Sequence, residues 1–190
     1  MTRIVAGTAG GRRIAVPKSF RGRPTAERAR EALFASLTVM LGSLDGLAVL
    51  DGYAGTGAVG IEALSRGAAR SLFVESDRAA ARAIGDNLRT LGLAGGTVLA
   101  RPMEQVAATA PPGRQPFDVV FLDPPYPTPA AEVHDVVAAL WDHGWLAAPA
   151  VLVVERPSRE DAFPWPDRIT PDRSRRYGEA TLWYGHAQAG

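Results

Sequence analysis

Short apolar runs alternate with helix-like stretches along most of the chain. Runs of the kind that form buried parallel strands occur at residues 47–50, 71–75, 97–100, 117–122 and 151–155. Apolar residues at helical spacing fill the intervals: up to residue 66 after the first run, then at 77–91, 103–110 and 129–143. This alternation predicts right-handed crossovers and an α/β fold built on a doubly wound, mostly parallel sheet.

The two ends of the chain depart from this pattern. Residues 4–7 and 12–16 flank Gly10-Gly11, which predicts a β-hairpin outside the main sheet. A basic, proline-containing loop follows at 17–24, and then a helix that begins near a capping Thr25 and stops at Gly42. At the other end, residues 175–184 alternate with period two around Gly178, which predicts a terminal antiparallel addition.

Length and composition favour one domain with a small appendage. The chain has 190 residues, of which 46% are hydrophobic, enough for a full core. We expect a basic N-terminal extension at 1–24 and a main domain at 25–190. With no cysteine, disulfides, zinc–thiolate sites and cysteine nucleophiles are excluded. No signal-peptide pattern and no run of about 18 apolar residues occurs, so we expect a cytoplasmic protein.

The sequence gives no sign of a metal site or of an aromatic cage for a ligand. The three histidines are spaced too irregularly for a metal-ligand set, so no metal is expected; they are His134, His143 and His186. Trp141, Trp145 and Trp183 are expected to pack in the core.

The formal net charge of +1 hides an uneven distribution. Residues 1–30 carry eight Arg or Lys side chains against the single acid Glu27, a charge of +7. The remaining residues hold thirteen basic and nineteen acidic side chains, a charge of −6. A basic end on an acidic body predicts a surface that faces a polyanion.

A glycine-rich loop follows the first apolar run. Residues 55–60 match the pattern G-x-G-x-x-G, and Glu75 lies twenty residues beyond Gly55, where a ribose-binding acid belongs. Alone, this pattern would indicate a dinucleotide site. Asp51, however, ends the strand beside the loop, and its carboxylate would repel a pyrophosphate on the helix N-terminus. S-adenosylmethionine, which carries a sulfonium and an ammonium group and no phosphate, fits the two acids better.

A second candidate site follows the run at 117–122. Asp123-Pro124-Pro125-Tyr126 comes directly after this strand, and ligands of open α/β sheets bind beyond the carboxyl ends of strands. We therefore expect Asp51, Glu75 and Asp123 to line one crevice. The two prolines remove N–H donors and hold the backbone extended, which leaves a rigid, acceptor-rich segment beside the acid.

Together these motifs resemble the S-adenosylmethionine-dependent methyltransferases that act on amino nitrogens. The order matches too: D-x-x-A-G-x-G after the first strand and D-P-P-Y after the fourth. More narrowly, residues 4–13, 23–34 and 176–181 look like the RsmD family, and the resemblance spans nearly the whole chain. It implies a seven-stranded Rossmann-like class I methyltransferase sheet and methylation of the exocyclic N2 of guanine 966 in bacterial 16S rRNA. Tyr53, where relatives often have Phe, is the visible departure.

The resemblance also implies residue roles. Asp123 and the Pro124 carbonyl would accept hydrogens of the guanine amine, with Pro125 keeping the segment rigid and Tyr126 stacking on the extruded base. The expected cofactor-binding residues are Thr25, Asp51, Ala54, Gly55, Gly57, Glu75, Ser76, Met103 and Glu104. The expected RNA-binding residues are Arg3, Arg12, Arg13, Lys18, Arg21, Arg23, Arg28 and Arg30. For Arg28 and Arg30, solvation or pairing with Glu27 and Glu31 is the alternative.

Four other functions remain to be weighed. A DNA adenine-N6 methyltransferase would need a target-recognition region, and none fits between these motifs. A protein glutamine methyltransferase gives no reason for the basic N-terminus, and an NAD-dependent oxidoreductase leaves residues 123–126 unexplained. A non-catalytic RNA-binding module explains the basic end but neither acidic strand end. We expect a monomer whose partner is 16S rRNA within the small ribosomal subunit or an assembly intermediate.

Overall fold

A seven-stranded sheet forms the centre of the computed structural model, which describes residues 2–16 and 27–188. Its strand order is β5-β4-β3-β6-β7-β9-β8. The first five strands in this order are parallel, and β9 and β8 join antiparallel. The strands are β3 (Ala48–Gly52), β4 (Arg70–Val74), β5 (Gly96–Leu99), β6 (Phe117–Leu122), β7 (Leu146–Pro157), β8 (Ile169–Tyr177) and β9 (Ala180–Ala187).

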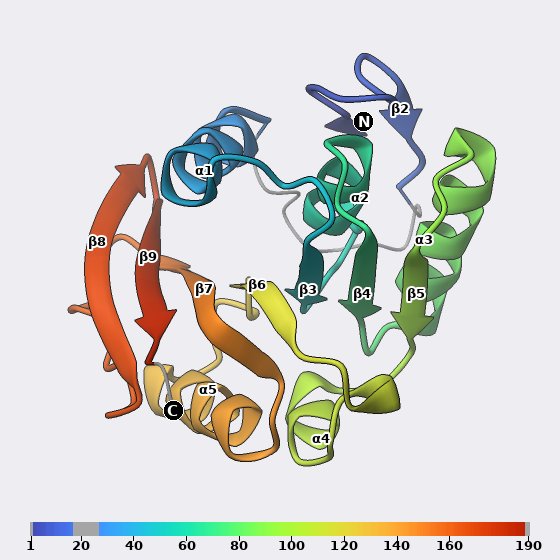
Figure 1. Cartoon of the computed structure of the whole chain (residues 1–190). Helices are drawn as coiled ribbons and strands as arrows, with labels where there is room; N and C mark the ends of the chain where they lie inside the picture. The colour runs from blue at the N-terminus through green and yellow to red at the C-terminus, as the bar shows by residue number, and fades with distance from the viewer. Residues whose placement is uncertain (1, 17–26, 189–190) are drawn as a thin grey trace.

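Helices cover both faces of this sheet, as Figure 1 shows. One face packs against α1 (Glu27–Leu41), α2 (Ala58–Ser65) and α3 (Arg78–Leu91). The other packs against α4 (Met103–Ala107) and α5 (Ala130–Asp142), with the short 3-10 helix η1 (Pro112–Arg114) before β6. The predicted doubly wound α/β fold is confirmed.

The chain reverses direction across the sheet at β3. From β3 it moves outward to β4 and β5, and then returns to β6 on the other side of β3. A crevice therefore opens beyond the carboxyl ends of β3 and β6, which is where ligands bind in such sheets. The glycine loop after β3 and residues 123–126 after β6 both lie at this edge.

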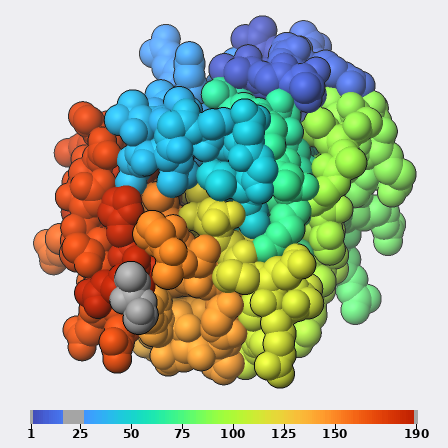
Figure 2. All heavy atoms as spheres, viewed as in Figure 1, coloured from blue at the N-terminus to red at the C-terminus, as the bar shows by residue number. Residues whose placement is uncertain are grey.

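The N-terminal hairpin is confirmed, but its first strand lies before the predicted residues 4–7 and its second covers only two of the predicted residues 12–16. β1 (Thr2–Arg3) pairs with β2 (Arg13–Ile14), and the segment lies against α2 and α3 beside α1 (Figures 1 and 2). Ile4 and Ile14 are fully buried in the core cluster that these helices share. The hairpin is thus part of the packed body.

Buried polar side chains of α2 and α3 fix the hairpin. Glu62 of α2 is inaccessible to solvent and accepts hydrogen bonds from the backbone N–H groups of Val5 and Ala6, at 2.8 and 3.0 Å. The same carboxylate pairs with Arg30 (3.2 Å) and Arg66 (2.8 Å). On α3, Asn87 exchanges two hydrogen bonds with the backbone of residue 15. The hydrogen bonds from the hairpin to Glu62 and Asn87 link segments more than fifty residues apart in sequence.

Several predicted boundaries were wrong, and the terminal antiparallel addition predicted at 175–184 spans 169–187. β7 begins five residues before the predicted position 151 and ends at 157, because its start pairs with Phe117 and its end with Ala180. α4 ends at Ala107 where 110 was predicted. Within the described residues no helix is long and apolar enough to cross a membrane.

Candidate functional site

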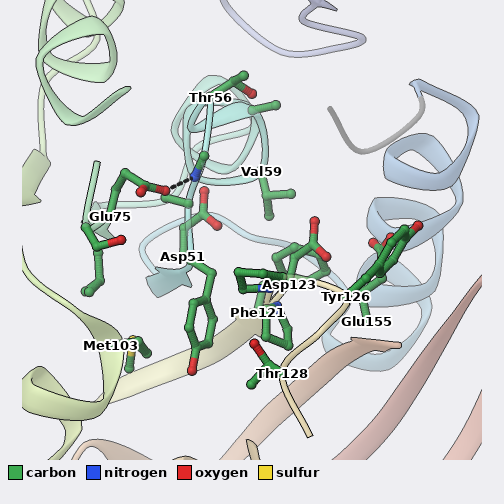
Figure 3. A pocket seen from close by; sticks show the side chains of 18 of the residues that line it. Asp51, Thr56, Val59, Glu75, Met103, Phe121, Asp123, Tyr126, Thr128 and Glu155 are labelled. Atoms are coloured by element: carbon green, nitrogen blue, oxygen red, sulfur yellow. Dashed lines mark hydrogen bonds between the residues drawn. The ribbon is translucent and has the colours of Figure 1, made fainter. Parts of the chain in front are cut away.

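A cavity of about 1250 Å³ lies at the carboxyl edge of the sheet. Asp51 of β3, Glu75 after β4 and Asp123 after β6 all line it, so the expectation that they share one crevice is confirmed. In Figure 3, Glu75 and Met103 lie on one side of this cavity, and Asp123 and Tyr126 lie on the other. The cavity therefore has two ends, one beside β4 and one beside β6 and β7.

In the part of the chain that the structure describes, the charged side chains that line the cavity are all acidic. No Lys, Arg or His occurs among the described residues that line it, whereas seven acids do: Asp51, Glu75, Asp77, Glu104, Asp123, Glu155 and Glu179. A pyrophosphate would face this wall without a cation to neutralise it. A ligand that carries ammonium or sulfonium charge, such as S-adenosylmethionine, fits these residues.

Asp51 forms the buried floor of the cavity. It is 2% exposed, and its Oδ2 accepts a hydrogen bond from the Gly60 N–H of α2 at 2.8 Å. Burial raises the pKa of Asp51 to about 8, against the opposing effect of the Gly60 hydrogen bond and with a further rise from the charge of Glu75. A cation beside this carboxyl would favour its ionised form.

Glu75 braces the glycine loop. Its Oε2 accepts the Gly55 N–H at 2.7 Å (dashed in Figure 3), and its Oε1 accepts the Asp77 N–H at 2.7 Å. Each carboxylate oxygen offers two lone pairs, so both can still accept a ligand hydroxyl. This arrangement fits a pair of ribose hydroxyls.

Other predicted cofactor residues surround this end of the cavity. Ala54, Gly55, Ser76, Met103 and Glu104 all line it. Tyr53, which the sequence singled out only as a departure from the family, also lines the wall, and its hydroxyl donates to Glu104 Oε1 at 2.8 Å.

Gly57 is the predicted cofactor residue, among those that the structure describes, that does not line the cavity. It precedes α2 with a left-handed backbone (φ 73°). A Cβ there would lie 2.9 Å from Ile84 of α3, so a side chain would clash with the core. Gly57 is needed for the turn and the packing behind the site.

The segment after β6 forms the opposite end of the cavity. All four residues from Asp123 to Tyr126 line it, and the Tyr126 side chain is 39% exposed. The Asp123 N–H donates to the Gly52 carbonyl of β3, at 3.3 Å. Farther along, Arg156 of β7 donates to the Thr128 carbonyl at 2.7 Å and pairs with Glu160, so the loop is tied at both ends.

The residues of this end that were not assigned from the sequence include Glu155 of β7, and Tyr177 and Glu179 at the β8–β9 turn. Glu155 ends the apolar run 151–154, which is the same signal that identified Asp51 and Asp123. Tyr177 and Glu179 lie in the motif at 176–181, for which the sequence suggested no role.

The predicted RNA-binding arginines differ in their surroundings. Arg3, Arg12, Arg13 and Arg28 are exposed. Arg3 pairs with Glu27 at 2.9 Å, while Arg12 donates to the Thr90 and Leu91 carbonyls at the end of α3. Arg30 is completely buried beside Glu62, so the structure contradicts its assignment to an RNA-facing surface.

Some expectations lie outside the described residues, namely those for Thr25, Lys18, Arg21 and Arg23. In the part of the chain that is described, no group of three or more His, Asp or Glu side chains is arranged to hold a metal ion.

Known proteins resemble this chain over most of its length. It matches the family described as "Conserved hypothetical protein 95" over residues 2–186. Proteins named ribosomal RNA small subunit methyltransferase D from Haemophilus influenzae and Escherichia coli K12 are 37% and 38% identical over 154 residues. These alignments span 80% of this chain, and 77% and 73% of the relatives.

Solved structures agree with this result. The Escherichia coli protein yhhF superposes with a TM-score of 0.86 at 30% identity, over 99% of this chain and 98% of that one. Magnesium protoporphyrin IX methyltransferase from Synechocystis, solved with bound S-adenosylmethionine, has a TM-score of 0.64 at 16% identity, over 85% of this chain and 79% of its own, and thus shares the fold.

The strand order and the glycine loop at the cavity define a Rossmann-like class I S-adenosylmethionine-dependent methyltransferase fold. Within that class, the chain belongs to the RsmD family, the family of the ribosomal RNA small subunit methyltransferases D.

Proposed function

We propose that this protein transfers a methyl group from S-adenosylmethionine to the exocyclic N2 of guanine 966 in 16S rRNA. The observation that carries the proposal is the rigid segment Asp123–Tyr126, which shares one acidic cavity with Asp51 and Glu75. The relatives named as ribosomal RNA small subunit methyltransferases support the RNA substrate. We expect a cytoplasmic monomer that acts on the small subunit or an assembly intermediate.

The cofactor would occupy the end of the cavity beside β4. Glu75 would accept its ribose hydroxyls, and Ser76, Met103 and Glu104 would surround the adenine. Asp51, Ala54 and Gly55 would face the methionine end, where the Asp51 carboxylate matches the ammonium group. When bound, S-adenosylmethionine supplies a methyl group on a positively charged sulfur, whose carbon–sulfur bond breaks as the carbon–nitrogen bond forms.

Asp123 and the Pro124 carbonyl would make the guanine amine reactive. The lone pair of this nitrogen is delocalised into the ring, and acceptors that hold its two hydrogens favour the pyramidal geometry needed for attack. The same acceptors stabilise the positive charge that develops on nitrogen, while the cavity supplies alignment. The proton leaves after transfer, when the nitrogen is acidic, so a carboxylate of ordinary basicity is sufficient to receive it.

Tyr126 would hold the target base outside its stack. A base that is stacked inside folded RNA cannot enter the cavity, so it must be extruded. The partly exposed ring of Tyr126 offers a stacking surface, and such aromatic contacts contribute about 1–3 kcal/mol per base.

Exposed arginines in two groups would bind phosphates around the target. One group belongs to the hairpin and the start of α1, with Arg13 and Arg28 as its members. The second lies on β8, where Arg175 and Arg176 are exposed directly before Tyr177 at the cavity. Phosphate contacts of this kind position the RNA without reading its bases.

Asp123 substitutions test the proposal. Incubation with labelled S-adenosylmethionine and unmethylated small subunits, followed by mass spectrometry of the digested rRNA, should yield N2-methylguanine at position 966. Asp123→Ala should abolish transfer and leave cofactor affinity within a few fold, because the interaction that it removes strengthens mainly in the transition state. Asp123→Asn should retain some activity, since an amide oxygen still accepts one N–H bond. A methylated ring nitrogen, or near-normal turnover by Asp123→Ala, would contradict the assignment.

A further inference from the structure

Glu155 is a buried acid on the wall of the cavity, at the end that holds Asp123. β7 pairs with β6 so that Val154 lies opposite Leu122, which places Glu155 in the same row as Asp123 on neighbouring parallel strands. Both residues line the cavity, and Figure 3 shows Glu155 on the side of Asp123 and Tyr126, away from Glu75 and Met103. Because β3 and β6 separate β4 from β7, Glu155 lies far from the proposed ribose position.

The surroundings of Glu155 are not those of a structural carboxylate. Its side chain is 7% exposed, yet its Oε2 has no hydrogen-bond partner among the described residues. Glu62, which is also buried, shows the contrast, because each of its oxygens accepts a backbone N–H and an arginine N–H. A buried acceptor without a partner carries a desolvation cost that a bound donor removes.

Guanine presents the donors that such a site lacks. On its Watson–Crick edge the N1–H lies next to the 2-amino group, so two donors point the same way. Adenine and cytosine instead place a ring nitrogen lone pair beside their amino group. A second acceptor next to Asp123 therefore distinguishes guanine from both.

We propose that the Glu155 carboxylate accepts the N1–H of the target guanine while Asp123 accepts the neighbouring amine, so that Glu155 determines base specificity. This inference rests on the proposed function, since it names the base-reading contact of the same site. Burial also raises the pKa of Glu155 to about 7, and an N–H donor that favours the ionised form would lower it again.

Replacing the N1–H donor of the base by an acceptor tests this assignment directly. Small subunits would be reconstituted with rRNA that carries either guanine or 2-aminopurine at the target position. 2-Aminopurine keeps the amine that is methylated but presents a lone pair at N1. The wild-type protein should show kcat/KM about 10- to 100-fold lower on 2-aminopurine, the range expected when one base-specific hydrogen bond cannot form.

Glu155→Gln should remove most of this preference. Its amide N–H can donate to N1 of 2-aminopurine, and its amide oxygen can still accept the N1–H of guanine, so neither base is excluded. The ratio of kcat/KM on guanine to kcat/KM on 2-aminopurine should therefore fall at least tenfold, while the cofactor Kd measured by calorimetry stays the same. Glu155→Asp, which keeps the carboxylate, should retain the preference for guanine at a reduced rate.

A control variant and the contradicting outcomes complete the test. Glu31→Gln, the same change on the exposed face of α1, should leave both rates unaltered. If Glu155→Gln lowers both rates equally or leaves the ratio unchanged, or if Glu155→Asp loses the guanine preference, Glu155 does not read the base. A wild-type protein that methylates neither particle would remove the proposed function, and this inference with it.

Discussion

At the scale of the residue, the protonation of Asp51 makes the stability of the protein depend on pH. Its pKa in the folded protein is about 8, well above the value near 4 that an exposed aspartate has. The folded state therefore holds the Asp51 proton more tightly than the unfolded chain does. This contribution to stability is complete below the unfolded pKa and is lost as the pH rises through about 8.

Asp51→Asn should consequently flatten the pH dependence of stability. Between pH 5 and pH 8.5 the free wild-type protein should lose more unfolding free energy than the variant, because the amide cannot ionise. Glu155 contributes a loss of the same sign to both proteins, so the difference between them isolates Asp51. Urea unfolding at the two pH values measures it, and parallel pH profiles would show that Asp51 titrates normally.

At the scale of the element, Glu62 of α2 connects the hairpin, α1 and α2. It pairs with Arg30 inside the protein, where both side chains are inaccessible to solvent. Breaking a buried pair by removing one partner typically costs about 3–5 kcal/mol, because the remaining charge stays buried and uncompensated. Deleting the hairpin would leave this pair in place but would remove the Val5 and Ala6 N–H donors of Glu62, so the hairpin stabilises the body of the protein.

Glu62→Gln should lower stability strongly for this reason. We expect a loss of about 3–5 kcal/mol in the free energy of unfolding, measured by urea denaturation at pH 7. Glu27→Gln is the matched control, because it breaks an exposed pair with Arg3 on the same side of the molecule and should leave the midpoint nearly unchanged. Equal effects of the two substitutions would contradict the role assigned to the buried pair.

The elements differ in how well the sequence alone predicts them. β6 occupies the predicted residues 117–122, and α3 begins after the predicted cap Asp77, whose side chain accepts the Ala80 N–H. Both depend on local patterns. The extent of β7 and the docking of the hairpin depend on partners distant in sequence, such as Ala180 for Pro157 and Glu62 for Val5, which local periodicity cannot reveal.

The residues of the candidate site also divide into those that local patterns predict and those that depend on partners distant in sequence. Asp51, Glu75 and Asp123 were predictable because each comes at the end of an apolar run, and parallel strands bring such ends together. The assignment of Arg30 to the surface was wrong because its side chain pairs with Glu62 of α2, and the packing of Gly57 against Ile84 of α3 was equally invisible in the sequence. Glu155 carried the same signal as Asp123, but only the pairing of β7 with β6 shows that the two lie in one row.

At the scale of the whole molecule, the protein combines an acidic cavity with basic surface segments. The cavity wall offers no described cation, whereas exposed arginines lie on the hairpin, on α1 and on β8. This separation lets the surface attract phosphates while the interior receives a neutral base and a cationic cofactor. RNA affinity should therefore depend on salt concentration. Substitution of the surface arginines should not change the affinity for the cofactor.

Paired substitutions on the two basic segments test this division. Arg13→Gln with Arg28→Gln removes charge from the hairpin and α1, and Arg175→Gln with Arg176→Gln removes it from β8. For each arginine–phosphate interaction that is removed, the slope of log affinity against log salt should fall by about one. Binding to small subunits would be measured by filter retention at several salt concentrations, and cofactor binding by calorimetry.

Arg114→Gln is the control for these pairs. Arg114 is also exposed, but it precedes β6 and so lies at the edge of the sheet opposite the cavity. It should leave the slope unaltered, and all five arginines should be dispensable for cofactor binding. An unchanged slope in one pair would exclude that segment from the RNA surface, and a slope lowered by Arg114→Gln would show that the interactions follow total charge and not position.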